Sequence, residues 1–369
     1  MARRKKKIRV CLVFGGRSGE HEVSLQSAKS IYEALDKKKY DVSLVGIDKS
    51  GRWHLGAASN YLLNATNPKL IKLNTKSPEV TAVTTPRETQ LIRVESRKEA
   101  GGVDVFFPII HGTFGEDGSL QGVFELLNAA YVGAGVLGSA VGMDKDVMKR
   151  LLHDAGLPTA RFFAVTRNTS RSSLNRIVRQ LGFPLFVKPA NLGSSVGITK
   201  VKKVGELFPA TKDAFRYDTK ILLEEYIHGR EIECSVLGNE SPVASVPGEV
   251  IPAHEFYSYE AKYIDPNGAR LEIPAKLPRK KIREVQNLAI KAFKVLECSG
   301  MARVDFFLMP NGKLVIDEIN TLPGFTKISM YPKLWEASGI PYKKLLDILI
   351  SLAIERKKER DKLKRSYEI

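Results

Sequence analysis

Four polar side chains near the carboxyl end of the sequence are spaced so that they could form a metal site, with oxygen ligands beside a guanidinium group. Asn311-Gly312 separates two runs rich in β-forming residues, which is a strong signal for a hairpin turn. If that pair forms the turn, Asp305 faces Glu318 and Arg303 faces Asn320 across the two strands. Side chains alternate along a strand and opposite partners share a face, so all four are expected to project together.

The chemistry of this predicted polar face suits phosphate and magnesium. Two carboxylates and an amide oxygen are hard ligands of the kind that Mg²⁺ takes, with phosphate and water completing its shell. A guanidinium beside them could stabilise phosphate or a developing oxyanion. The alternative is an exposed hairpin with cross-strand charge pairing. The turn after Asn320, rich in Gly, Thr and Ser, favours the metal site. The opposite face of the hairpin is expected to hold Val304, Phe306, Asp317 and Ile319.

A second segment could bind an anion through its backbone. The sequence has no GxxxxGK[ST] motif, and residues 15–19 do not fit GxGxxG, which disfavours a Walker NTPase and a nicotinamide dehydrogenase. Instead, Lys188-Pro189 ends an expected strand and leads into Gly193-Ser-Ser-Val-Gly197. Small residues between two glycines let backbone amides approach an anion, and Lys188 adds a positive charge. A tight turn with a surface lysine is the alternative.

The elements that must position these segments alternate between strands and helices. An apolar run over Ile8–Phe14, a helical pattern from Ser24 and a strand over Tyr40–Ile47 predict a βαβ opening with a parallel sheet. A glycine-rich run over residues 133–142 leads into a helix over Met143–Leu152. We expect three α/β domains with boundaries at 1–133, 134–224 and 225–369. Further strands are expected at 103–110, 161–165, 184–189, 221–226, 231–237, 243–250, 301–308 and 313–319, and helices at 274–296 and 342–354.

Composition restricts the class of protein. Of 369 residues, 43% are hydrophobic and 27% are charged, as in soluble globular proteins. No apolar run could span a bilayer, and the basic start does not resemble a signal peptide, so the expected location is the cytoplasm without membrane insertion. Three widely spaced cysteines are expected to be reduced and buried. The net charge of +17 raises nucleic-acid binding as an alternative, but no aromatic residues interleave the basic tail, so a solvated surface is favoured.

Several blocks, in order along the chain, resemble the signatures of the D-alanine:D-alanine ligase family. They cover most of the sequence between about Ile8 and Tyr342. The blocks are Gly15-Gly-Arg-Ser-Gly-Glu-His-Glu-Val-Ser24, His111-Gly-Thr-Phe-Gly-Glu-Asp-Gly-Ser-Leu-Gln-Gly122, Lys188-Pro189 with Gly193–Gly197, Tyr259-Glu-Ala-Lys-Tyr263, and Arg303-Val-Asp305 with Glu318-Ile-Asn320.

The resemblance implies an α/β protein with the ATP-grasp fold and an N-terminal Rossmann-like domain. It further implies that ATP, with two Mg²⁺ (or Mn²⁺) ions, phosphorylates the carboxylate of one D-alanine. The amine of a second D-alanine then attacks the acyl phosphate, releasing phosphate and giving the D-alanyl-D-alanine used in peptidoglycan precursors. Positive groups must neutralise the transferring phosphoryl group, and a lid must exclude water.

The resemblance also assigns roles to single residues. Lys145 and Lys188 are expected at the nucleotide phosphates, Glu224 at the adenine amino group and Glu231 at the ribose. Ser195, Glu225 and Lys262 are further expected nucleotide contacts, although the family often has lysine where this chain has Glu225. Asp305, Glu318 and Asn320 are the expected metal ligands, Arg303 and the amide of Gly324 the oxyanion donors, Glu20 the ammonium anchor, His111 and Ser329 substrate contacts, and Glu20, Ser194 and Tyr263 a hydrogen-bonded set that closes the site.

Two choices remain within the family. The segment Tyr259–Tyr263 favours an amine over a hydroxyl nucleophile, and hence a dipeptide product. D-serine as second substrate, or another carboxylate–amine pair, stays open. The family habit is a homodimer, which we expect here.

Overall fold

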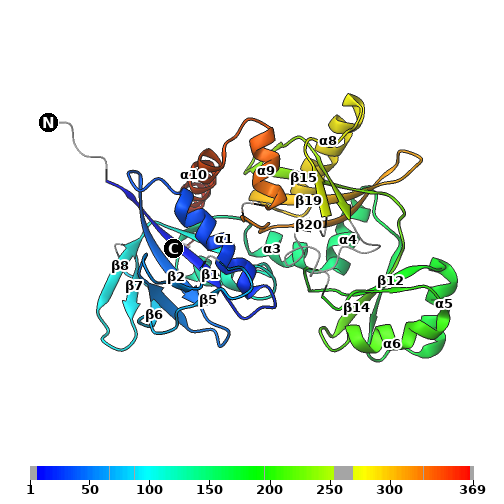
Figure 1. Cartoon of the computed structure of the whole chain (residues 1–369), viewed down its shortest axis with the longest axis horizontal. Helices are drawn as coiled ribbons and strands as arrows, with labels where there is room; N and C mark the ends of the chain where they lie inside the picture. Colours follow the sequence, from blue (N-terminus) through cyan, green and yellow to red (C-terminus); the bar gives the residue numbers. More distant parts are fainter. Residues whose placement is uncertain are drawn as a thin grey trace.

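The computed structural model describes residues 6–65, 67–86, 88–194, 196–252, 269–326 and 328–365. Within them, three larger sheets with their helices follow one another along the chain (Figure 1). Two smaller sheets fill much of residues 62–103. They consist of β4 (Leu62–Leu63) with β5 (Lys72–Leu73), and of β6 (Val80–Thr84), β7 (Thr89–Arg93) and β8 (Glu99–Val103).

The first sheet is largely parallel and has the strand order β10–β9–β1–β2–β3. β1 pairs in parallel with β2 and β9, so the parallel sheet expected from the βαβ opening is confirmed. Residues 10–14 of β1 are all buried, as expected for a continuous apolar run covered on both faces. The elements are β1 (Ile8–Gly15), α1 (His21–Ala34), β2 (Tyr40–Ile47), β3 (Trp53–Gly56), β9 (Val105–Ile109), α2 (Ser119–Leu126) and β10 (Ala130–Tyr131).

Two helices follow the first sheet where one was expected. The glycine-rich run forms α3 (Val136–Met143), and α4 (Lys145–Asp154) starts directly after it. Gly138 allows α3 to pack closely, because a Cβ at this position would lie 2.6 Å from the carbonyl oxygen of Glu297. The absence of a side chain at Gly138 therefore serves the packing of this helix.

The second sheet is antiparallel and has the strand order β11–β14–β12–β13. Two helices share one hydrophobic core with it, through residues such as Leu174 and Leu207. Its elements are β11 (Phe162–Thr166), α5 (Arg171–Leu181), β12 (Leu185–Pro189), β13 (Thr199–Val201), α6 (Val204–Ala214) and β14 (Lys220–Glu225).

The third sheet has the strand order β18–β17–β15–β19–β20, with β16 added to β15. The single strand expected over residues 243–250 is instead two short strands, because Pro247 between them has no N–H for the ladder. The elements are β15 (Arg230–Gly238), β16 (Val243–Ala244), β17 (Gly248–Pro252), β18 (Ala269–Glu272), α8 (Arg279–Val295), β19 (Gly300–Leu308), β20 (Leu314–Asn320) and α9 (Met330–Ala337).

The last helix, α10 (Tyr342–Asp361), joins the first and third sheets. Its buried side chains, including Leu345 and Leu349, belong to the same hydrophobic core as residues of β1, α1 and β9. Arg356 of α10 also donates a hydrogen bond to the carbonyl oxygen of Tyr131 at 2.9 Å. This shared core fixes the two sheets relative to each other, and so fixes the residues between them.

Candidate active site

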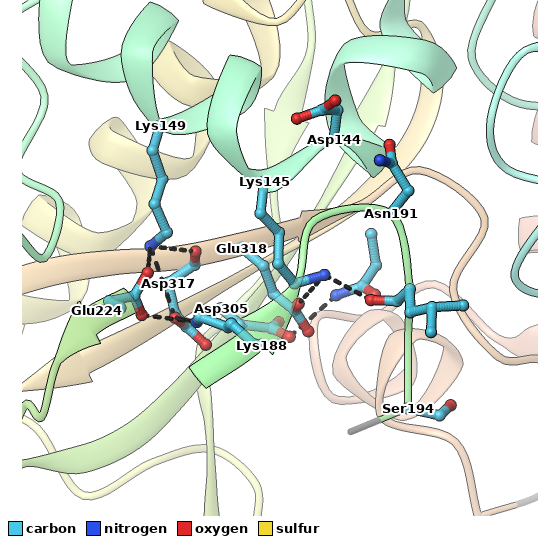
Figure 2. Close-up of polar contacts among 12 residues, drawn as sticks. Asp144, Lys145, Lys149, Lys188, Asn191, Ser194, Glu224, Asp305, Asp317 and Glu318 are labelled. Carbon is cyan, nitrogen blue, oxygen red and sulfur yellow. Dashed lines mark hydrogen bonds and ion pairs between the residues drawn. The ribbon is translucent and has the colours of Figure 1, made fainter. Parts of the chain in front are cut away.

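The start of α4 places two lysines on one side of the helix. Asp144 caps the helix, since its Oδ1 accepts hydrogen bonds from the backbone N–H groups of Asp146 and Val147 at 3.1 Å each. Lys145 and Lys149 lie four residues apart, about one helical turn, and so share a face. Figure 2 shows both side chains pointing toward the carboxylates of the third sheet.

Lys149 and Lys188 alternate with Glu224 and Asp317 in a buried ionic cluster, which we call the lysine–carboxylate cluster (Figure 2). Lys188 Nζ lies 2.6 Å from Glu224 Oε1 and 3.4 Å from Asp317 Oδ1. Lys149 Nζ lies 2.9 Å from Glu224 Oε2 and 3.8 Å from Asp317 Oδ1. Two positive and two negative charges therefore compensate one another; Lys149, Lys188 and Glu224 are buried, and Asp317 is partly exposed.

The charges of this cluster shift the pKa values of its members. Burial alone would lower the pKa of Lys188, but the Asp317 and Glu224 carboxylates raise it above its ordinary value. Burial works against ionisation of Asp317 as well, yet Lys188 and Lys149 lower its pKa to about 2. Both groups are therefore charged at neutral pH, and the cluster is a set of ion pairs.

The hairpin of β19 and β20 has the predicted partners, but not the predicted turn. Met309 N–H donates to Lys313 O and Gly312 N–H to Met309 O, so three residues, 310–312, form the loop between this hydrogen-bonded pair, and Gly312 has a φ of +81°. Near the turn, Phe306 pairs with Ile316; beyond the irregularity, Asp305 pairs with Glu318 and Arg303 with Asn320.

A β-bulge at Asp317 explains this change of register. The longer turn shifts the register by one residue, and the extra residue in the bulge shifts it back. Asp305 therefore pairs with Glu318, as was also predicted from a two-residue turn without a bulge. The prediction that Asp317 shares the buried face of Val304 and Ile319 is wrong, because its side chain contacts Lys188 and Lys149 instead. Both Asp317 and its neighbour Glu318 therefore contact lysines of the site.

The predicted metal ligands are already engaged by protein groups. Arg303 donates two hydrogen bonds to Asp305, each 2.7 Å long, and lies 2.9 Å from Glu233. Asn320 Nδ2 donates to Asp305 Oδ2 at 3.0 Å. Lys145 Nζ lies 3.6 Å from Glu318 Oε2. Within the described residues, no three acidic, histidine or cysteine side chains converge closely enough to hold a metal ion by themselves.

The loop after β12 reaches the first sheet through Ser194. Its Oγ donates a hydrogen bond to Glu20 Oε1, and the backbone of Leu192 accepts a 2.7 Å hydrogen bond from Lys145 Nζ. Glu20 is buried at the start of α1. Glu116, which sequence reasoning missed, lies nearby and accepts a 2.7 Å hydrogen bond from Gly112 N–H. Burial and the neighbouring Glu20 raise the pKa of Glu116 well above its ordinary value.

His111 connects α1 with the segment after β20. It follows β9 and is buried, and burial lowers its pKa to about 4. Its Nδ1 lies 3.1 Å from the carbonyl oxygen of Leu322, so Nδ1 carries the proton there, while Nε2 lies 3.1 Å from Ser27 Oγ. The Phe325 N–H also donates to Ser27 Oγ at 3.3 Å. The imidazole is therefore neutral and held in one orientation.

Ser329 and Gly324 lie against each other in this segment. A Cβ at Gly324 would come within 2.8 Å of Ser329 Oγ, so a larger residue at this position would displace the hydroxyl. Ser329 Oγ accepts the Thr326 N–H at 3.0 Å. The turn that was expected beside the polar face is thus built around Ser329.

Two family models match the chain. The "D-ala D-ala ligase N-terminus" model matches residues 9–134, and the "D-ala D-ala ligase C-terminus" model matches residues 151–351. The chain belongs to the D-alanine–D-alanine ligase family. The resemblance seen in the sequence motifs is therefore confirmed over nearly the whole chain.

Individual relatives agree with the family models. The D-alanine–D-alanine ligase of Shouchella clausii is 56% identical over 96% of this chain and 97% of its own length. The D-alanine–D-alanine ligase structure from Coxiella burnetii superposes with a TM-score of 0.84 at 41% identity, over 96% of both chains. The VanG D-Ala:D-Ser ligase structure from Enterococcus faecalis superposes with a TM-score of 0.83 at 34% sequence identity, over 94% of this chain and 100% of its own. The ATP-grasp fold is likewise confirmed.

The other expected nucleotide contacts of this family member have different surroundings. Glu225 is the last residue of β14. One of its carboxylate oxygens lies 2.6 Å from Nε of Arg161, the residue before β11, so the two side chains form an ion pair. Glu231 is partly buried near the start of β15, opposite Phe307. Ser195, Lys262 and Tyr263 lie outside the described residues.

Four site residues were not identified from sequence motifs alone. Glu116 stands inside the block 111–122 and Lys149 follows Lys145 by one turn, so both positions offered a weak signal. Asp317 and Glu233 depend on the bulge and on the pairing of β15 with β19, which sequence patterns do not specify.

Proposed function

We propose that this chain joins two D-alanines into D-alanyl-D-alanine, with ATP converted to ADP and phosphate. The observation that supports this most is the convergence of Lys145, Lys188, Arg303 and Glu318 from four different elements beside the Glu20–Ser194 contact. Cations for phosphate and an acid for a substrate ammonium are the groups that an acyl-phosphate ligase needs together. The product serves the synthesis of peptidoglycan precursors.

The reaction proceeds in two steps. A carboxylate oxygen of the first D-alanine takes the γ-phosphoryl group of ATP, and the bond from that group to ADP breaks. The amine of the second D-alanine then attacks the acyl carbon, loses a proton, and the C–O bond to phosphate breaks. Lys145 and Lys188 neutralise the phosphates, while Arg303 and the Gly324 N–H stabilise the tetrahedral oxyanion.

Substrate placement follows from the groups at the first sheet. Glu20 accepts the ammonium of the first D-alanine, and its contact with Ser194 closes the loop over the site together with Tyr263. His111, neutral in the folded protein, lies beside the first substrate, and Ser329 binds the carboxylate of the second. Glu224 and Glu231 bind the adenine and the ribose, with Ser195, Glu225 and Lys262 as further nucleotide contacts.

The donor chemistry at the polar face fits magnesium. Asp305, Glu318 and Asn320 provide carboxylate and amide oxygens on paired positions of β19 and β20, and these residues would hold two Mg²⁺ (or Mn²⁺) ions. Bound there, the ions would supply positive charge to the terminal phosphates of ATP. Arg303 has to share Asp305 with the metal, since it donates both of its hydrogen bonds to that carboxylate.

A D-serine-accepting enzyme is the second candidate, since the VanG D-Ala:D-Ser ligase structure covers 94% of the chain with a TM-score of 0.83. The remaining features are part of the same proposal: three domains (1–133, 134–224 and 225–369), a homodimer, and a cytoplasmic location. Among the described residues, no helix combines the length and hydropathy needed to cross a lipid bilayer.

Phosphate release tests the proposal. With ATP and Mg²⁺, D-alanine should trigger release of one phosphate per dipeptide formed, L-alanine should not, and mass spectrometry should detect D-alanyl-D-alanine. A mixture of D-alanine and D-serine decides between the two candidates by the mass of the product. Absence of release at saturating D-alanine would reject the function.

A further inference from the structure

Lys149 is a buried cation that the proposed reaction does not use. Its side chain is 0% exposed, although a lysine is rarely buried completely. Its Nζ donates a hydrogen bond to the backbone carbonyl of Asp317 at 3.1 Å, and lies 2.9 Å from Glu224 Oε2. One ammonium thus holds both the bulge of β20 and the end of β14.

Lys149 and Lys188 share the same two carboxylates. Glu224 lies close to both lysines, at 2.6 and 2.9 Å, and Asp317 lies farther from both, at 3.4 and 3.8 Å. Any movement of Lys188 toward a nucleotide phosphate therefore leaves two carboxylates behind, of which Glu224 is buried and Asp317 is partly exposed. An unpaired buried charge is strongly unfavourable, so a counter-ion must remain with them.

We infer that Lys149 is a positioning residue for nucleotide binding: it stays with Glu224 and Asp317 and so frees Lys188 to bind phosphate. This inference rests on the proposed function, in which Lys188 contacts ATP. Without Lys149, the two carboxylates would bind Lys188 more tightly and would lose their remaining counter-ion when it left. Both effects weaken nucleotide binding.

The surroundings of the two lysines determine which of them stays. Lys149 extends from α4, whose first turn is capped by Asp144, and its ammonium is fixed by the carbonyl of Asp317. Lys188 lies near the end of β12, just before the loop that leads to Ser194, and its side chain is 7% exposed. The lysine next to the loop is the one placed to meet a ligand.

Lys149→Met tests the inference by calorimetric titration with Mg–ATP. Methionine keeps the unbranched chain as far as Cε and removes the charged ammonium group. We expect ATP to bind about 10- to 100-fold more weakly, the cost of an uncompensated buried carboxylate. In steady state, KM for ATP should rise far more than KM for D-alanine. Lys149→Arg, which keeps the charge, should bind ATP within about threefold of wild type.

Asp317→Asn distinguishes this role from a merely structural one. In Lys149→Met/Asp317→Asn only one carboxylate is left when Lys188 moves, so ATP binding should recover by about fivefold or more relative to Lys149→Met. If Lys149→Met instead weakens ATP binding because the bulge has lost the hydrogen bond to the carbonyl of Asp317, the second substitution would not restore ATP binding. If Lys149→Met does not fold, the double variant is compared with Asp317→Asn alone, and the double variant should bind ATP more weakly.

Lys281→Met is the matched control. Lys281 also pairs with a glutamate, Glu284, at 2.7 Å and donates to a backbone carbonyl, that of Gly312, but it lies on α8. The Lys281→Met variant should bind ATP with the same affinity as the wild type. Unchanged ATP affinity in Lys149→Met, or a loss that Asp317→Asn does not reverse, overturns the inference. Wild-type protein that binds ATP but releases no phosphate with D-alanine overturns the proposed function instead.

Discussion

The hydroxyl of Ser194 donates a hydrogen bond to the carboxylate of Glu20, across 174 positions of sequence. Ser194 belongs to the loop after β12 in the second sheet, whereas Glu20 precedes α1 beside the first sheet. This contact joins the loop expected at the nucleotide to the residue expected at the amino-acid substrate. Loop closure and substrate binding are therefore expected to depend on each other.

Ser194→Ala should uncouple the loop from Glu20. Loss of this hydrogen bond lets the loop move away from the substrate, and kcat/KM for D-alanine should fall about 10- to 100-fold, with ATP affinity changed little. Phosphate-release kinetics with each substrate varied in turn measure both effects. Ser351→Ala removes an exposed hydroxyl that bonds only within α10 and should leave the kinetics unchanged. Normal kcat/KM in Ser194→Ala would remove the loop contact from the mechanism.

Glu318→Gln should lower turnover by about 100-fold or more, because the amide lacks the charge that a metal and Lys145 require. Manganese binding, followed by electron paramagnetic resonance in the presence of ATP, should weaken in parallel. Asp361→Asn alters a surface carboxylate that pairs with Lys357 and serves as the control. Unchanged manganese binding together with unchanged turnover would overturn the assignment of Glu318 as a ligand.

Gly138→Ala should destabilise the protein by about 2 kcal/mol. The added Cβ would lie 2.6 Å from the carbonyl oxygen of Glu297, so α3 or the segment after α8 has to move. Urea unfolding measures the change. Gly205→Ala is the matched control, since a Cβ there meets no atom within 4 Å and α6 should gain about 0.5 to 1 kcal/mol. Equal stabilities of the two variants would contradict the close packing of α3.

His111 should make the folded protein less stable at acidic pH. Burial lowers its pKa from 6.5 to about 4 in the folded state. The unfolded chain therefore binds more protons between these values, and the stability present above pH 6.5 is lost as pH falls toward 4. His111→Gln removes this loss, so the stability advantage of wild type should shrink by about 1 to 2 kcal/mol between pH 7 and pH 5.

Urea unfolding at a series of pH values checks this expectation, with His153→Gln as the control because His153 is exposed. A difference in the free energy of unfolding between wild type and His111→Gln that stays constant across the series would contradict this expectation. It would show that His111 takes up a proton as readily in the folded protein as in the unfolded chain.

The linear sequence predicted much of the fold because its signals are local. The apolar runs of β1 and β2 and the helical period of α10 depend on neighbouring residues. Both strands lie close to their expected bounds, and α10 begins where it was expected but continues beyond residue 354 to Asp361. α3 was missed, since Gly138 and Gly142 oppose a helix locally. Its stability comes from packing against Glu297 and Thr321, which are far away in the sequence.

For the site, the sequence by itself determined which chemical groups are present and that Asp305 pairs with Glu318, because strand alternation and a nearby turn are local rules. Only the tertiary structure decided where Asp317 points, since one extra residue in a bulge changes the face of a side chain without a clear mark in the sequence. The same holds for Lys149, whose burial between β14 and β20 depends on how three distant segments pack.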